Sequence, residues 1–328
     1  MDLLIKDPLR KPAPLRSGDQ IAIVAPASNV KREALEAGCN RLRDLGYRPV
    51  YDSSIFEQDL YFAGSAERRA RELHHAFANP EVRAIVCARG GYGSNYLLPL
   101  LDLDLIRSNP KIFAGYSDLT CLLTYLRDAA GLVTFHAPMA IKDFGAAEGV
   151  HLPSWNAAVS GSREWSLNSG QEGMAGLVPL VPGSGEGELY GGCLSILVAS
   201  LGTPYEIQTR DKLLFLEDVN AKPYQIDRML MQLKFSGKLE GVRGIIFGEM
   251  LDCMQTANQG YALEDVVRRV VGDLGIPVAY GLRSGHVTTQ NVTLPLGVHA
   301  ELVTDRAGVQ LNIREAATAT GADAVPIS

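Results

Sequence analysis

The chain has 328 residues, 46% of them hydrophobic and 21% charged, which is the composition of an ordinary soluble globular protein with room for two domains. Its 31 Lys and Arg residues against 37 Asp and Glu residues give a formal charge of -6, and no basic run is present, so we expect no nucleic-acid partner. No apolar run approaches the roughly 18 residues of a membrane helix, so we expect no membrane-spanning segment.

Short apolar runs alternate with amphipathic ones in the first half of the chain. The expected strands cover residues 20–25, 48–51, 84–88, 111–115 and 132–136. The expected helices cover 31–45, with Ser28 or Asn29 as the cap, 66–78, with Ser65 as the cap, and the stretch after Ser117. This alternation is typical of a parallel sheet with helices on both faces.

Gly, Ser and Pro become frequent between about Asp143 and Gly187, where the periodicity fades. We therefore predict an N-terminal α/β domain over residues 1–150, a linker over 151–186 and a second domain over 187–328. The expected strands of the second domain are 188–192, 212–217, 242–248, 293–303 and 308–313, and its expected helices are 194–201, 224–235 and 263–274.

The cysteines and histidines show no metal-binding spacing. The five cysteines are scattered and lack a C-x-x-C pair: Cys39, Cys87, Cys121, Cys193 and Cys253. This pattern favours reduced thiols in the cytoplasm over a disulfide framework or a zinc site. No H-x-x-H or H-E-x-x-H spacing is present, so we expect no metal. Charges and prolines interrupt the N-terminal MDLLIKDPLRKPAPL before a signal peptide could form.

The segment KIFAGYSDLT ends an expected strand and opens an expected helix. Ligands and chemistry collect at this carboxyl edge of a parallel sheet. Gly115 permits a tight turn, from which Ser117 would project its Oγ, with the backbone N–H of Asp118 free to face an oxyanion. The arrangement resembles the nucleophile elbow of α/β-hydrolases, although G-x-S-x-G would require glycine in place of Leu119. A serine that caps its helix is the competing interpretation.

A glycine loop, in CARGGYGSNYLLPLLD, follows the expected strand 84–88. Its backbone N–H groups could approach a ligand closely. A phosphate-binding loop is the rival interpretation, but such a loop would need a Lys-Ser or Lys-Thr pair where Ser94 and Asn95 follow Gly93.

One carboxylate and two histidines are candidates for acid and base. Glu217 ends the apolar run KLLFLE, where a solvated turn or a helix cap is the alternative interpretation. His286 lies in a glycine-flanked loop, GLRSGHVTTQNVTLPLG, and an incidental loop histidine is the alternative there. His136 ends an expected strand at the same edge of the sheet and is the second candidate for the base.

Taken together, these segments resemble the LD-carboxypeptidase family, serine peptidases that act on murein peptides in the cytoplasm. The resemblance runs from about Leu15 to about Ile313. It rests on nine segments in the family's order: LRSGDQIAIVAPAS, ARGGYGS, FAGYSDLT, TFHAPM, LYGGCLS, LGTPY, LLFLEDV, PYQIDRML and GHVTTQNVTLPLG.

The resemblance implies a catalytic triad with Ser117 as the nucleophile, Glu217 as the acid and His286 as the base. It assigns the oxyanion hole to the backbone N–H groups of Gly91 and Asp118. The implied fold is α/β, with an N-terminal flavodoxin-like parallel-sheet domain that carries the nucleophile elbow and a C-terminal β/α barrel-like domain that carries the acid and the base. A homodimer without a cofactor is also implied.

The implied substrate is a murein tetrapeptide, cleaved between an L-configured centre, on diaminopimelate or lysine, and the terminal D-alanine. A carboxypeptidase must bind a free carboxylate, for which the guanidinium fork is the best side chain. The candidates are Arg89, Arg228 and Arg283. Three positions depart from the family pattern and bear on substrate contacts: Tyr96 in place of an arginine, Ala137 in place of a glycine and Ala221 in place of a glutamate.

Three other functions compete with this one. A relative within the family cleaves an amide between a peptide and a nucleotide and so gives immunity to a microcin-like antibiotic. In a non-catalytic alternative, the first domain binds a nucleotide or a sugar at its glycine loop and Ser117 only caps a helix. A general esterase of the α/β-hydrolase fold would share the order Ser, acid, His, but Leu119 and the glycine-poor C-terminal strands argue against it.

Overall fold

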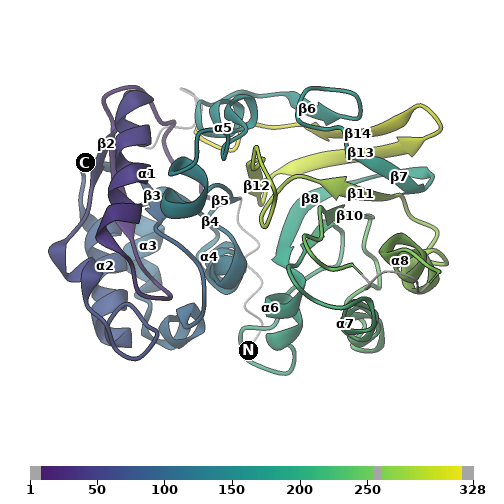
Figure 1. The fold of residues 1–328 in the computed structure, drawn as a ribbon, viewed down its shortest axis with the longest axis horizontal. Coiled ribbons are helices and arrows are strands. Elements are labelled where there is room, and N and C mark those ends of the chain that lie inside the picture. The colour runs from purple at the N-terminus through teal and green to yellow at the C-terminus, as the bar shows by residue number, and fades with distance from the viewer. Residues whose placement is uncertain (1–8, 255–259, 320–328) are drawn as a thin grey trace.

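The computed structural model describes residues 9–254 and 260–319, which form two sheets with helices packed against them (Figure 1). The first sheet has the strand order β12-β5-β4-β3-β1-β2. Its strands are β1 (Gln20–Val24), β2 (Arg48–Val50), β3 (Val82–Cys87), β4 (Ile112–Gly115), β5 (Thr134–His136) and β12 (Leu294–Leu296). The first five are parallel in the order 2-1-3-4-5, which is the flavodoxin-like order, so this part of the predicted fold is confirmed.

The helices of the first half follow the predicted pattern. They are α1 (Arg32–Asp44), α2 (Ala66–Ala78), α3 (Leu103–Ser108) and α4 (Thr120–Ala130), with the short helices η1 (Ser53–Phe56), η2 (Ser94–Leu100), η3 (Ser117–Leu119) and η4 (Ala140–Phe144). Ser65 caps α2 as predicted, because its Oγ accepts a hydrogen bond of 3.2 Å from the backbone N–H of Arg68. The predicted cap of α1 is wrong. Lys31 occupies that position, and Ser28 Oγ instead accepts a bond from the N–H of Tyr92.

The second sheet has eight strands in the order β6-β14-β13-β8-β9-β10-β11-β7. The strands are β6 (Trp165–Asn168), β7 (Val178–Val181), β8 (Gly183–Cys193), β9 (Lys212–Glu217), β10 (Gly244–Gly248), β11 (Val278–Leu282), β13 (His299–Asp305) and β14 (Gly308–Ile313). Strands β8 to β11 are parallel, and antiparallel strands flank them. The sheet curls toward closure, because Thr304 of β13 donates a 2.7 Å hydrogen bond to the carbonyl of Val181 in β7.

The helices of the second half are α5 (Leu152–Val159), α6 (Leu194–Ala199), α7 (Pro223–Phe235) and α8 (Leu263–Val271). Helix α5 and strands β6 and β7 lie in the segment 151–186, where a linker is predicted, and both strands belong to the second sheet. Strand β12, in turn, leaves the second half and pairs antiparallel with β5 of the first sheet. The division into 1–150, 151–186 and 187–328 stays a prediction.

One apolar core connects the two halves. Side chains of β8, β9 and β10, such as Leu189, Phe215 and Ile246, are buried in the same cluster as those of β1, β3 and β4. A second cluster lies between the curled sheet and helices α6 to α8. The shared core fixes the carboxyl ends of β4, β5 and β9 relative to one another. Across the described residues, no helix has the length and hydropathy to cross a membrane.

Candidate active site

Ser117 lies at a strained turn between β4 and α4. Its φ is +66°, a left-handed value that costs an L-residue about 1–3 kcal/mol and occurs where the surrounding structure enforces it. The residue is half-buried. Tyr116 precedes η3 and Leu119 precedes α4 at the cap positions, and neither helix has a side-chain cap. Ser117 therefore does not cap a helix, and its positive φ at a turn from a strand to a helix is the backbone geometry expected for a nucleophile elbow.

The glycine loop packs directly against this serine. A Cβ built on Gly90 would lie 2.9 Å from Ser117 Cβ and 3.0 Å from its Oγ. Gly91 and Gly93 both have positive φ, +113° and +118°. Among the described residues, the backbone N–H groups of Gly91 and Asp118 make no hydrogen bond, as an oxyanion hole would require.

Three side chains hold the glycine loop in this position. Asp118 accepts a 2.8 Å hydrogen bond from the backbone N–H of Ser94, whose Oγ donates in turn to the Asp118 carbonyl at 2.7 Å. Arg69, almost fully buried, donates to the carbonyls of Pro26 and Gly93 at 2.6 and 2.7 Å. From the sequence, Arg69 could be placed only on a helix, because nothing in a helical pattern reveals that a buried guanidinium reaches a distant loop.

Gly90→Ala is expected to lower the turnover rate at least about 100-fold with little loss of stability, because the new methyl group would displace the serine Oγ by the tenths of an ångström that matter for attack. Gly176→Ala is the matched control, since its Cβ would meet only the carbonyl oxygen of Gly281 at 3.4 Å. Steady-state kinetics and thermal unfolding of both variants check this. An active Gly90→Ala enzyme would show that the contact with Ser117 is irrelevant.

The buried Glu217 pairs with the half-buried His286 on the other side of the site. Glu217 ends β9 with 1% of its surface exposed, and its Oε2 lies 2.8 Å from His286 Nδ1 and 3.1 Å from the His286 backbone nitrogen. A Cβ on Gly285 would lie 2.6 Å from the Glu217 carboxyl carbon, so only glycine fits before the histidine. The rings of His286 and Tyr116 form a T-shaped pair, 5.2 Å between centroids, which brings His286 beside the residue that precedes Ser117.

The environment keeps the Glu217 carboxyl ionised. Burial alone would raise its pKa, but the positive charge that His286 and His136 can carry lowers this pKa from 4.5 to about 2. A carboxylate at Nδ1 fixes the tautomer of His286 so that Nε2 is free to accept a proton. No hydrogen bond joins Ser117 to His286 among the described residues, and such bonds commonly tighten only when substrate is bound.

A buried polar network supports the histidine loop. Asn291 donates to Asp143 Oδ1 at 3.1 Å and accepts from the backbone N–H of Gly285 at 2.9 Å. Asp143 also accepts from the N–H of Met139 at 2.8 Å, and burial raises its pKa to about 6. In the sequence, Asn291 stood out only as part of the segment GHVTTQNVTLPLG. Its spacing from His286 was the available signal for this role.

The three candidate arginines have different surroundings. Arg89 is exposed and directly precedes Gly90, the glycine that packs against Ser117. Arg283 is half-buried in the turn after β11. Arg228 lies on the exposed side of α7, where its guanidinium packs over the ring of Tyr224 at 5.7 Å. Arg89 is therefore the candidate whose neighbour in the chain, Gly90, packs against Ser117.

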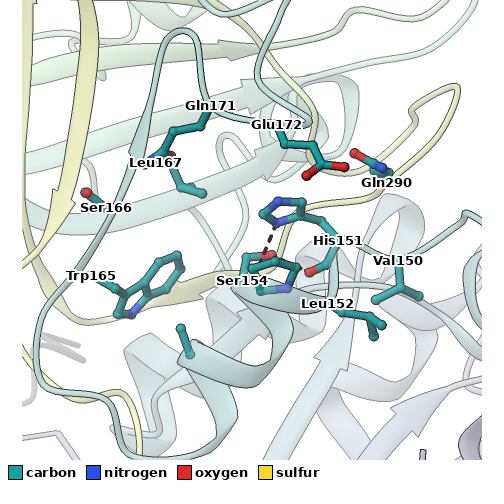
Figure 2. A pocket seen from close by; sticks show the side chains of 12 residues that line it. Val150, His151, Leu152, Ser154, Trp165, Ser166, Leu167, Gln171, Glu172 and Gln290 are labelled. Carbon is teal, nitrogen blue, oxygen red and sulfur yellow. Dashed lines mark hydrogen bonds between the residues drawn. The ribbon is translucent and has the colours of Figure 1, made fainter.

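A separate cavity of about 490 Å³ lies between α5, β6 and the loop that carries Gln290 (Figure 2). His151 points into it beside Glu172, and its ring accepts a 3.3 Å bond from the backbone N–H of Ser154. None of the residues predicted for the active site lines this cavity. In the part of the chain that the structure describes, no group of three or more His, Cys, Asp and Glu residues could hold a metal ion.

Family models cover both halves of this architecture. Residues 21–137 match the LD-carboxypeptidase N-terminal domain, and residues 186–302 match the LD-carboxypeptidase C-terminal domain. The chain belongs to the LD-carboxypeptidase family. This membership makes it a hydrolase of the carboxypeptidase class and confirms the resemblance found in the sequence.

Individual relatives of this LD-carboxypeptidase span nearly the whole chain. The probable murein peptide carboxypeptidase of Bacillus subtilis is 39% identical and covers 90% of this chain and 92% of its own length. The crystal structure of the muramoyltetrapeptide carboxypeptidase from Oxalobacter formigenes superposes with a TM-score of 0.80, at 30% identity over 90% of this chain and 99% of that one. The microcin C7 self-immunity protein MccF of Escherichia coli is 31% identical and covers 91% of this chain and 94% of its own length.

Proposed function

We propose that the chain is a serine-type LD-carboxypeptidase in which Ser117 is the nucleophile, His286 the general base and Glu217 the acid that orients the base. The observation that carries this proposal is the 2.8 Å contact of a fully buried carboxylate with the ring of His286, beside a serine held at a φ of +66°. A solvated turn would not bury Glu217, and a helix cap would not strain Ser117.

In this mechanism, Ser117 Oγ attacks the carbonyl carbon of the last peptide bond while its proton passes to Nε2 of His286. Glu217 keeps the proton on Nδ1 and stabilises the imidazolium. The carbonyl oxygen becomes an oxyanion and accepts hydrogen bonds from the N–H groups of Gly91 and Asp118, an effect of about 2.7–4 kcal/mol per donor in comparable sites. The C–N bond then breaks as His286 protonates the amine, and water hydrolyses the remaining ester with the same base.

The proposed substrate is a murein tetrapeptide, in keeping with the names of the Bacillus subtilis and Oxalobacter formigenes relatives. The bond cleaved joins the L-centre of diaminopimelate or lysine to the terminal D-alanine, as a step of cell-wall recycling. We place the reaction in the cytoplasm, because all five cysteines are free, as is usual for proteins of a reducing compartment. A homodimer follows from the family resemblance, and sedimentation velocity tests it.

The test of the proposed function is D-alanine release from L-Ala-γ-D-Glu-meso-diaminopimelyl-D-Ala by the purified chain in the presence of a chelator. Release is expected at a rate proportional to enzyme concentration. A folded chain that releases no D-alanine from this peptide, or from its lysine analogue, would refute the proposed substrate.

A second candidate is the hydrolysis of a peptide-nucleotide amide, because the 31% identical MccF is named a microcin C7 self-immunity protein. The same three residues would perform this reaction, so only the leaving group differs. Cleavage of an aspartyl-adenylate-like amide without D-alanine release from the tetrapeptide would favour this candidate over the first.

Arg89→Lys is expected to raise the KM for the tetrapeptide about tenfold, because a lysine cannot bind the terminal carboxylate through two parallel hydrogen bonds. Arg228→Lys is the control, and its KM should stay unchanged since that guanidinium packs over Tyr224 on the surface of α7. Initial rates over a range of tetrapeptide concentrations measure both. If KM is unchanged in Arg89→Lys, Arg228→Lys and Arg283→Lys alike, no candidate arginine holds the carboxylate.

A further inference from the structure

His136, at the end of β5, contacts the catalytic acid from the side opposite to His286. None of its surface is exposed. Its Nδ1 lies 3.0 Å from Ser284 Oγ, and its Nε2 lies 3.8 Å from Glu217 Oε1. The imidazole edge packs against the ring of Phe215, 5.0 Å between centroids. The mechanism proposed above gives this buried ionisable group no task.

The hydrogen bonds of Ser284 fix one proton of the His136 ring. Ser284 Oγ donates its single hydrogen to the carbonyl of Val292 at 2.8 Å. It can therefore only accept from His136, so Nδ1 of His136 carries a proton. A ring in the neutral form would then have its lone pair on Nε2, pointing toward the Glu217 carboxylate.

That neutral form would leave two acceptors facing each other inside the protein. Glu217 Oε1 and His136 Nε2 are both buried and have no hydrogen-bond partner among the described residues. The other carboxylate oxygen, Oε2, already accepts two bonds from His286. An ionised oxygen without a partner in a dry site is strongly unfavourable, whereas a proton on Nε2 converts the contact into an ion pair.

We propose that His136 is a positioning residue that faces Glu217 as an imidazolium and thereby keeps His286 neutral and ready to act as the base. The inference rests on the proposed function. The positive ring of His136 balances the Glu217 charge, so that Glu217 orients His286 without holding it in the protonated form. His136 and Glu217 come from the two different sheets, so the pair also fixes the carboxyl end of β9 against that of β5.

The other ionisable groups around this pair do not take over that task. Burial raises the pKa of the Tyr116 phenol and of the Cys193 thiol well above their ordinary values, so both stay neutral. The Asp143 carboxylate accepts hydrogen bonds from the backbone N–H of Met139 and from the side-chain amide of Asn291. The Asp218 carboxylate accepts from the backbone N–H groups of Ser195 and Val219. Glu217 is thus the carboxylate with an oxygen left for His136.

The test compares the pH dependence of kcat/KM for D-alanine release in the wild type, His136→Gln and Ser284→Ala. Glutamine can still donate one hydrogen bond but carries no charge, so His286 accepts a proton more readily. The acidic limb of the His136→Gln profile is expected to move to higher pH by about 1 unit. Ser284→Ala removes the acceptor that holds the Nδ1 proton, so a neutral ring can donate through Nε2 to Glu217, and the limb should move in the same direction. A limb that stays in place in His136→Gln would reduce His136 to a packing role and overturn the proposal.

A second measurement does not depend on activity or on the folding of a variant. Nitrogen-15 NMR of histidine-labelled wild type should show two resonances of one ring in the imidazolium range at pH 7, absent from the spectrum of His136→Gln where that variant folds. Signals of neutral imidazole from every ring at pH 7 would overturn the proposal. Imidazolium signals in a chain that releases no D-alanine would uphold the charge state of His136 while refuting the proposed function.

Discussion

Ser117→Ala is expected to abolish D-alanine release and to leave the fold intact. Removal of a triad nucleophile costs on the order of 10⁶-fold in kcat, because the remaining groups cannot replace the covalent step. Alanine meets the same backbone constraint as serine at a φ of +66°, and Ser117 Oγ has no hydrogen bond to lose among the described residues. The thermal midpoint should therefore stay that of the wild type, while D-alanine release falls to the uncatalysed level.

Ser53→Ala is the matched control, because Ser53 is an exposed serine at the start of η1. It should retain wild-type activity. A serine-directed fluorophosphonate small enough to enter the site should label the wild type and Ser53→Ala but not Ser117→Ala. Equal D-alanine release by Ser117→Ala and the wild type would show that another group attacks the peptide.

Glu217→Gln is expected to lower kcat about 10⁴-fold with little change in KM. The amide is nearly isosteric but uncharged. Its carbonyl oxygen can still accept from Nδ1 of His286, whereas the rotamer that turns its NH2 group toward Nδ1 forces the wrong tautomer. The loss of negative charge also removes the stabilisation of the imidazolium that forms in the transition state. Steady-state kinetics with the tetrapeptide measure the drop, and retention of the near-ultraviolet circular dichroism spectrum verifies the fold.

The adjacent carboxylate provides the control for this change. Asp218 accepts hydrogen bonds from the backbone N–H groups of Ser195 and Val219, and none of its bonds reaches His286. Asp218→Asn should therefore lower kcat by less than about tenfold. Equal losses in the two variants would attribute the effect to disturbance of the strand end rather than to the orientation of His286.

Strands and helices with strong local patterns were predictable from the sequence. The run KLLFLE coincides with β9 (Lys212–Glu217), and the serine before AERRARELHHAFA caps α2. The cap of α1 was not predictable, because Ser28 Oγ serves the glycine loop more than 60 residues later. The edge strands β6 and β7 lie in a Gly- and Ser-rich segment whose structure depends on neighbouring strands of the second sheet. Local pattern carries no information about such pairings.

In the candidate site, too, some residues could be predicted from local sequence patterns and others could not. Ser117 and Glu217 could be singled out because each follows or ends an apolar run, where parallel strands place side chains at one edge. His286 could be singled out because it lies in a glycine-flanked loop between two strand-like segments. Arg69, Asn291 and the contact of His136 with Glu217 could not, since each depends on side chains that meet across long stretches of chain. Such contacts are set by tertiary packing, about which the hydrophobic periodicity of the sequence carries no information.

Strand β12 comes from the second half of the chain but pairs with β5 of the first sheet. This pairing limits the order in which the peptidase can fold. The five parallel strands of the first sheet leave the ribosome early, but Leu294, which pairs with His136, emerges only when most of the chain has been made. Until then, the outer edge of β5 stays open, with backbone groups that no strand has paired. The loop that carries His286 directly precedes β12, so both are made at nearly the same point of synthesis. A chain that ends before this loop would hold Ser117 without His286, and under the proposed mechanism it could not hydrolyse a peptide.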